Sequence, residues 1–187
     1  MDAEVKPAPE YGAQNSYFLA HELALRDVRI WLELSARRVA GHELLAWHEG
    51  SEAYLPLEGG AKPRCVRPDA WFVYGVGERR LVGLVEIDRG TERGLRQWGR
   101  KIEDYRTLFE TGALKNGTGY ANARLLVFTS TERRRNSLTR LLEENAPASL
   151  TTRSWLTVQS TTERVGLNER AWRLPGITGL HPLLKPV

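Results

Sequence analysis

The sequence predicts an α/β protein in which a mixed β-sheet is flanked by helices. Three segments carry apolar residues at the spacing of a helix, and five shorter segments are rich in strand-forming residues. Their order along the chain is helix, three strands, helix, strand, helix, strand (α-β-β-β-α-β-α-β), which favours a sheet with helices on its faces. At 187 residues, the chain is long enough for one ordinary domain and too short for two comfortable ones.

The composition excludes several classes of protein. With 41% hydrophobic and 27% charged residues, the chain is typical of a globular protein. No apolar run approaches the roughly 18 residues that a membrane span needs, so we expect no membrane association. The N-terminus lacks the basic and apolar regions of a secretory signal, and Cys65 alone cannot form an internal disulfide. These features predict a cytoplasmic protein.

The first half of the chain supplies one helix and three strands. Residues 1–16 are rich in Pro, Ala and Gly and predict a flexible lead-in, so the single domain is expected over residues 17–187. Residues 17–39 predict a helix that Gly41 ends. Its expected apolar stripe consists of Phe18, His21, Leu25, Val28, Leu32 and Val39. Strands are predicted at residues 43–49, 66–76 and 79–88.

The second half alternates helices and strands. Thr91 is the predicted N-cap of a helix that ends near Gly112. The apolar face of that helix is expected to carry Leu95, Trp98, Ile102, Tyr105 and Phe109. A strand follows at residues 122–130, a helix at 131–145 and a last strand at 154–159. The remaining segment reads as irregular, with Trp172 packing back on the core.

The second and third strands predict a hairpin whose register places carboxylates together. Gly77-Glu78 is a Gly-X pair of the kind that a two-residue type II′ turn accepts. The residue numbers of cross-strand partners then have a constant sum. The expected pairs are Trp71 with Leu84, Val73 with Val82, and Asp69 with Glu86.

Three carboxylates are therefore expected to converge. Side chains alternate along a strand, so Glu86 and Asp88 should point to the same face as Asp69. Like charges placed opposite one another are destabilising, and a divalent cation with a preference for oxygen ligands, Mg²⁺ or Mn²⁺, would compensate them. In the alternative interpretation, Asp69 caps a turn, Asp88 begins one, and Glu86 is solvated near the end of a strand.

Pro68-Asp69, a hairpin and Glu86-x-Asp88 resemble the core of the PD-(D/E)xK restriction-endonuclease-like nucleases. The resemblance implies a PD-(D/E)xK-like domain in which Asp69 and Glu86 bind the metal ion. A lysine two residues after the Glu would help to activate water, but Asp88 stands at that position. Lys101, in line with Gln97 and Tyr105 on the following helix, is the candidate replacement, and Arg89 is a second candidate.

A second resemblance covers most of the chain. The strings HELALRDVRIWLELSARR, PDAWFVY, VEIDRGTE, KIEDY, RLLVFTSTERR and ERAWRLPG are similar to the replication-relaxation proteins of plasmids and other mobile elements. Members of that family often carry a winged helix-turn-helix before this region, and this sequence shows none. A separate DNA-targeting domain or protein is therefore a candidate partner.

The charge balance is compatible with DNA as a partner. Lys and Arg number 27 against 23 Asp and Glu, and most of the cations are Arg, whose planar fork suits phosphates. The leading hypothesis is a metal-dependent DNA nuclease or nickase with Asp69, Glu86, Asp88, Lys101 and Gln97 in its site. The runner-up is a catalytically inactive, nuclease-like DNA-binding accessory protein. A third reading makes Tyr105 a nicking nucleophile, although its apolar neighbours argue for packing.

Overall fold

A five-stranded mixed sheet forms the centre of the protein. The computed structural model describes residues 11–57, 63–90 and 94–184. The strands of the sheet are β1 (His42–Glu49), β4 (Ala70–Val76), β5 (Arg79–Asp88), β6 (Arg124–Thr129) and β7 (Ser154–Val158). They lie in the order β1-β4-β5-β6-β7. β1, β4 and β5 pair antiparallel, whereas β5, β6 and β7 pair parallel.

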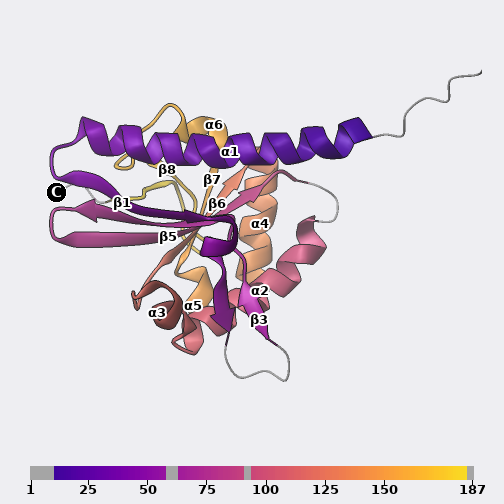
Figure 1. Cartoon of the computed structure of the whole chain (residues 1–187). Coiled ribbons are helices and arrows are strands. Elements are labelled where there is room, and N and C mark those ends of the chain that lie inside the picture. Colours follow the sequence, from indigo (N-terminus) through magenta and orange to yellow (C-terminus); the bar gives the residue numbers. More distant parts are fainter. Residues whose placement is uncertain (1–10, 58–62, 91–93, 185–187) are drawn as a thin grey trace, which may run out of the picture.

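Helices cover both faces of this sheet (Figure 1). The long helix α1 (Tyr11–Arg38) crosses one face, with the short α6 (Gln159–Thr162) beside it. The other face is covered by α2 (Gly94–Glu110), α3 (Ala113–Thr118), α4 (Glu132–Asn145) and α5 (Ala148–Thr151). Smaller elements complete the described chain: η1 (Gly50–Ala53), β2 (Leu55–Leu57), β3 (Arg64–Val66), β8 (Arg170–Trp172) and β9 (His181–Pro182).

The predicted α/β class is confirmed as a mixed sheet packed against helices, and the restriction-endonuclease-like fold stays a prediction. The eight expected elements correspond to α1, β1, β4, β5, α2, β6, α4 and β7. The strand expected at residues 66–76 is divided in two, because β3 ends at Val66 and β4 begins at Ala70. The C-terminal segment, expected to be irregular, contributes the small β8–β9 sheet, and Trp172 is fully buried as predicted.

Helix α1 differs from its prediction at both ends. It begins at Tyr11, after Pro9, so residues 11–16 are helical and only residues 1–10 of the expected lead-in lie outside the described chain. Leu25, Val28 and Leu32 are buried, whereas Phe18 is 65% exposed because its stretch of α1 extends past the sheet (Figure 1). Val39 is also exposed because it follows the end of the helix.

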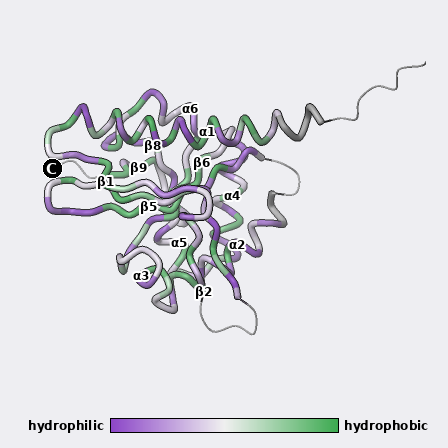
Figure 2. Tube along the Cα trace, viewed as in Figure 1, coloured by the Kyte–Doolittle hydropathy of each residue, from purple (hydrophilic) through white to green (hydrophobic). Residues whose placement is uncertain are grey.

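Figure 2 shows hydrophilic and hydrophobic colours alternating along α1, which fits a helix with one face on the sheet. No helix in the described part of the chain is long and apolar enough to cross a bilayer. The alternation of side chains along β4 supplies a core on each face of the sheet. Trp71 and Val73 pack towards α2 and α4, whereas Phe72 and Tyr74 pack towards α1 and Trp172.

The hairpin of β4 and β5 has the predicted register. Trp71 pairs with Leu84 and Val73 with Val82. Gly77 has a positive φ of 56°, and within the described residues no residue other than glycine has a positive φ, which fits a type II′ turn at Gly77-Glu78. Asp69 lies one residue before β4 and outside the register of its ladder: its backbone amide donates to the carbonyl of Val85 at 2.9 Å, so the expected pair of Asp69 with Glu86 is not formed. The hairpin therefore brings Asp69 alongside the end of β5.

Candidate active site

The centre of the site is a buried carboxylate with two donors from helix α2. Glu86, on β5, has only 2% of its surface exposed. Lys101 forms an ion pair with Oε2 of Glu86, and the Tyr105 hydroxyl donates to Oε1 at 2.7 Å. Lys101 and Tyr105 are four residues apart and therefore lie on one face of α2. The contact expected between Lys101 and the carboxylates is present, while its catalytic role stays a prediction.

The electrostatics of this pair follow from its burial. Burial raises the pKa of Glu86, and the nearby charge of Asp69 raises it further. The contacts of Glu86 with Lys101 and Tyr105 lower this pKa, but they do not cancel the increase. Burial would lower the pKa of Lys101, but the charges of Glu86 and Asp69 outweigh it and raise that pKa. The pair therefore holds protons more tightly than the two groups would in water.

Asp69 is held by contacts with the sheet and with helix α1. Its Oδ2 accepts a 2.6 Å hydrogen bond from the backbone amide of Ile87, and its Oδ1 lies 3.2 Å from Nε2 of His21 on α1. The hydrogen bond between His21 and Asp69 raises the pKa of His21 above 6.5. His21, expected on the apolar stripe of the first helix, therefore faces the carboxylate site.

Asp88 is directed towards Arg134, a residue outside the predicted site. Arg134 on α4 binds both of its oxygens, at 2.6 and 2.9 Å, and the indole of Trp98 donates to Oδ2 at 2.8 Å. Burial would raise the pKa of Asp88, but the hydrogen bonds from Arg134 and Trp98 lower it. Arg134 lies 46 residues further along the chain, in a cluster of three arginines, and that cluster was the only signal for it.

These contacts accompany the expected convergence of three carboxylates, whose role as metal ligands stays a prediction. Asp69, Glu86 and Asp88 each have a separate basic partner, His21, Lys101 and Arg134. Across the described residues, no group of three or more His, Cys, Asp or Glu side chains is arranged to hold a metal ion. Helices α1, α2 and α4 each supply one of these basic side chains to this end of the sheet.

A small cavity opens beside Glu86. Its volume is about 70 Å³, and its lining includes Glu86, Asp88, Gln97 and Lys101. Gln97 is exposed, and Asp69 is not among the lining residues. Arg89, the second candidate cation, also lines the cavity, but it donates to the carbonyl of Ala20 instead of a carboxylate. The predicted N-cap Thr91 lies outside the described residues.

The residues around this cavity suit a hard divalent cation by their chemistry. Two carboxylates and a side-chain amide are oxygen donors of the type that Mg²⁺ and Mn²⁺ prefer. The volume exceeds the roughly 30 Å³ that one water molecule occupies in the liquid. Because Lys101 and Arg134 already balance the two carboxylates, a metal ion would have to share or displace these cations.

Comparison with known proteins decides the family. The model of the replication-relaxation family matches residues 5–123, which is more than half of the chain. The chain belongs to the replication-relaxation family. Membership implies a role in replication. No curated protein and no solved structure gave a significant match.

The replication-relaxation match contains the main part of the site and ends just before β6. Asp69, Glu86, Asp88 and Lys101 lie inside it. Arg134 lies outside it, on α4. The ion pair between Asp88 and Arg134 therefore joins the matched region to the rest of the chain.

Proposed function

We propose that this chain is a metal-dependent DNA nuclease or nickase that acts in the replication or transfer of a plasmid or other mobile element. The observation that carries the proposal is the contact of Lys101 with Glu86. A PD-(D/E)xK-like site needs a cation near its second carboxylate, and Asp88 cannot supply one. Lys101 reaches the same carboxylate from α2, and 37% of its side chain remains accessible to a substrate. The order of the elements and the mixed sheet directions also support this proposal.

In the proposed site, Asp69 and Glu86, with help from Asp88, would hold Mg²⁺ or Mn²⁺. Such a metal ion supplies an activated water and charge stabilisation for the scissile phosphate. Lys101 places a positive charge where negative charge develops in the transition state. Tyr105 fixes the orientation of the Glu86 carboxylate, and the Ile87 amide with His21 fixes that of Asp69.

DNA would be attracted by arginines near this end of the sheet. Helix α4 begins with Glu132, and Arg133, Arg134 and Arg135 follow. Arg134 is occupied by Asp88, while Arg133 is exposed. Phosphate contacts by such residues release counterions, so binding should be independent of sequence and should weaken as salt increases.

Cleavage of supercoiled plasmid DNA tests the proposal. We expect nicked or linear product with Mg²⁺ or Mn²⁺, and none in EDTA. Glu86→Gln should abolish cleavage, whereas Glu103→Gln, which changes an exposed carboxylate on the same helix as Lys101, should not. Both variants should bind DNA as the wild type does. Wild-type protein that binds DNA but cleaves none with either metal would exclude the nuclease.

A second candidate function is a catalytically inactive DNA-binding accessory protein in the same process. The pairing of Asp88 with Arg134 favours it, because both carboxylate oxygens are taken by a neighbouring arginine. In this reading the acidic residues join β5 to the helices and bind no metal. The two candidates are distinguished by the plasmid assay, in which the accessory protein binds and does not cleave.

A further inference from the structure

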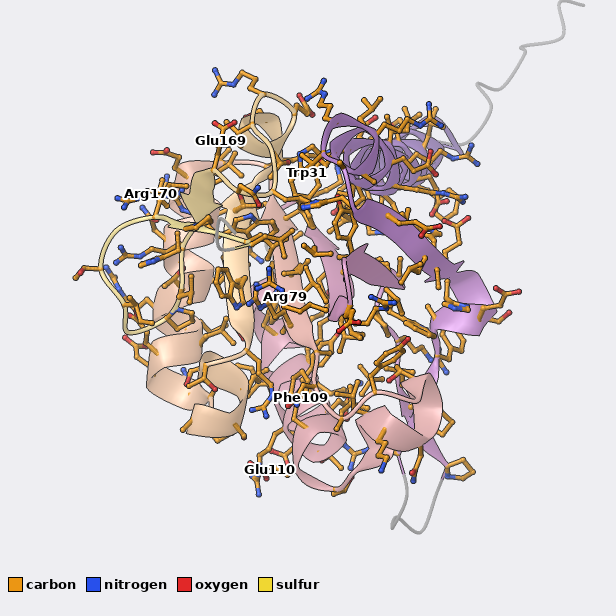
Figure 3. The ribbon with its side chains drawn as sticks, turned by 90° about the vertical axis from the view of Figure 1, so that its left-hand side faces the viewer. Trp31, Arg79, Phe109, Glu110, Glu169 and Arg170 are labelled. Atoms are coloured by element: carbon orange, nitrogen blue, oxygen red, sulfur yellow. The ribbon has the colours of Figure 1, made fainter. Side chains whose placement is uncertain are left out.

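A second cavity lies at the opposite end of the sheet from Glu86. Its volume is about 560 Å³, and arginines from three segments line it: Arg79, Arg80, Arg124 and Arg153. Arg79 and Arg80 begin β5, whereas Asp88 ends it. A strand rises about 3.3 Å per residue, so roughly 30 Å of β5 separates Arg79 from Asp88. Figure 3 looks onto this end of the molecule and labels Arg79 near the middle.

The described lining of this cavity holds several positive charges and no carboxylate. No Asp or Glu lines it, and none of the ion pairs within the described residues involves its four arginines. Four like charges around one space repel one another, and a bound anion would relieve that repulsion. The described lining therefore carries a positive charge that it does not itself balance.

Neutral groups hold these guanidinium groups in place. Arg124 donates to the carbonyl of Leu183 and lies 4.3 Å from the ring centroid of Trp155. Arg153 donates to the carbonyl of Ser149 at 2.8 Å, and Arg80 donates to that of Gly77 at 2.7 Å. Burial lowers the pKa of Arg124, as expected for a cation without an anionic partner. Carbonyl contacts of this kind fix the donors without neutralising them.

The remaining wall of the cavity is apolar. Val76, Leu81 and Val82 line it from the hairpin, and Leu183 and Leu184 line it from the C-terminal segment. A volume of this size is in the range of sites that enclose a small organic ligand. Arginine is the side chain best suited to phosphate, because its fork donates two parallel hydrogen bonds. An open groove with arginines on one part and an apolar wall on another suits a ligand with the same division.

We propose that this cavity binds a free nucleoside di- or triphosphate. The phosphates lie against Arg79, Arg80, Arg124 and Arg153, and the base lies against the leucines and valines of the wall. The apolar part of the wall favours this ligand over the sugar-phosphate backbone of a DNA strand. The site is independent of the proposed nuclease chemistry, because it shares no residue with the cavity beside Glu86.

Titration calorimetry with ATP, ADP, AMP and adenosine, in EDTA to keep metal ions away from the acidic site, tests this inference. We expect affinity to fall from ATP to ADP to AMP, and adenosine to show no binding. The double variant Arg79→Gln/Arg80→Gln changes two exposed residues and should weaken ATP binding at least about tenfold. The double variant Arg140→Gln/Arg164→Gln removes the same charge elsewhere on the surface and should leave ATP binding unchanged.

Three outcomes would overturn the inference. These are no ATP binding by the wild type, equal weakening by both double variants, and binding of DNA at this site with none of ATP. Glu86→Gln should bind ATP as the wild type does. That variant separates this inference from the proposed nuclease, because either can fail while the other holds.

Discussion

The ammonium of Lys101 contacts the buried carboxylate of Glu86, although the two residues come from different elements, α2 and β5. Removing only the lysine leaves a carboxylate that is 2% exposed with Tyr105 as its remaining donor. We expect Lys101→Met to lower the free energy of unfolding at pH 7 by about 2–3 kcal/mol, somewhat less than for a fully buried pair because Lys101 is partly exposed.

The double variant Glu86→Gln/Lys101→Met provides the matched control for that prediction. With both charges gone, no unpaired buried charge remains, so the double variant should be more stable than Lys101→Met alone. Urea unfolding of the wild type, both single variants and the double variant measures the coupling energy. Strictly additive effects would show that the two groups do not interact.

Stability should depend on pH through His21. Its hydrogen bond with Asp69 raises the folded-state pKa above 6.5, so the stabilisation is fully present below pH 6.5 and is lost as pH rises through the folded pKa. The stability difference between the wild type and His21→Gln should therefore shrink between pH 6 and pH 8. Unfolding curves at several pH values check this. A difference that stays constant from pH 6 to pH 8 would contradict this role for His21.

The ion pair of Asp88 with Arg134 should stabilise the folded protein. Their side chains are 9% and 11% exposed, and Arg134 binds both oxygens of Asp88. Arg134→Gln should cost about 2–4 kcal/mol, because it leaves a mostly buried carboxylate without its cation. Arg134→Lys should recover only part of this, since an ammonium cannot reproduce the two parallel hydrogen bonds. Thermal unfolding measures the loss, and Arg133→Gln on the exposed surface should change stability by less than about 0.5 kcal/mol. A similar loss in both variants would contradict a specific role for Arg134.

Tyr105 is expected to support Glu86 and not to act as a nucleophile. It is fully buried, and burial raises its pKa well above the usual value. Tyr105→Phe removes one hydrogen bond and should cost about 1–2 kcal/mol. If the protein cleaves DNA, this variant should still do so, and no covalent link between protein and DNA should form. A denaturing gel of reactions with end-labelled DNA would reveal such a link, which would restore the nucleophile hypothesis.

Local rules predicted the hairpin and its consequences. The two-residue turn at Gly77-Glu78 fixes the register of β4 and β5, so the pairs Trp71 with Leu84 and Val73 with Val82 followed from counting residues. The contact of Lys101 with the carboxylates could also be predicted from the sequence. Lys101 lies four residues before Tyr105 on α2, so both side chains are on one face of that helix.

The partners that arrive from distant segments could not be predicted in this way. Arg134 reaches Asp88 from α4, and His21 reaches Asp69 from α1. These contacts depend on how the helices pack across the sheet, which no local spacing encodes. Phe18 shows the same limit, since its exposure follows from the extension of α1 past the sheet and not from its apolar character. The arginine cavity likewise gathers Arg79, Arg124 and Arg153 from separate strand ends.

The metal ion is the element of the proposed function that can be observed most directly. Crystals of the protein soaked in Mn²⁺ should show an anomalous difference peak against the carboxylate of Glu86, within reach of Asp69 or Asp88. The peak should be lost in Glu86→Gln crystals soaked in the same way. The absence of a peak beside Glu86 at millimolar Mn²⁺, with Lys101 still on that carboxylate, would contradict the metal-dependent nuclease and favour the accessory protein.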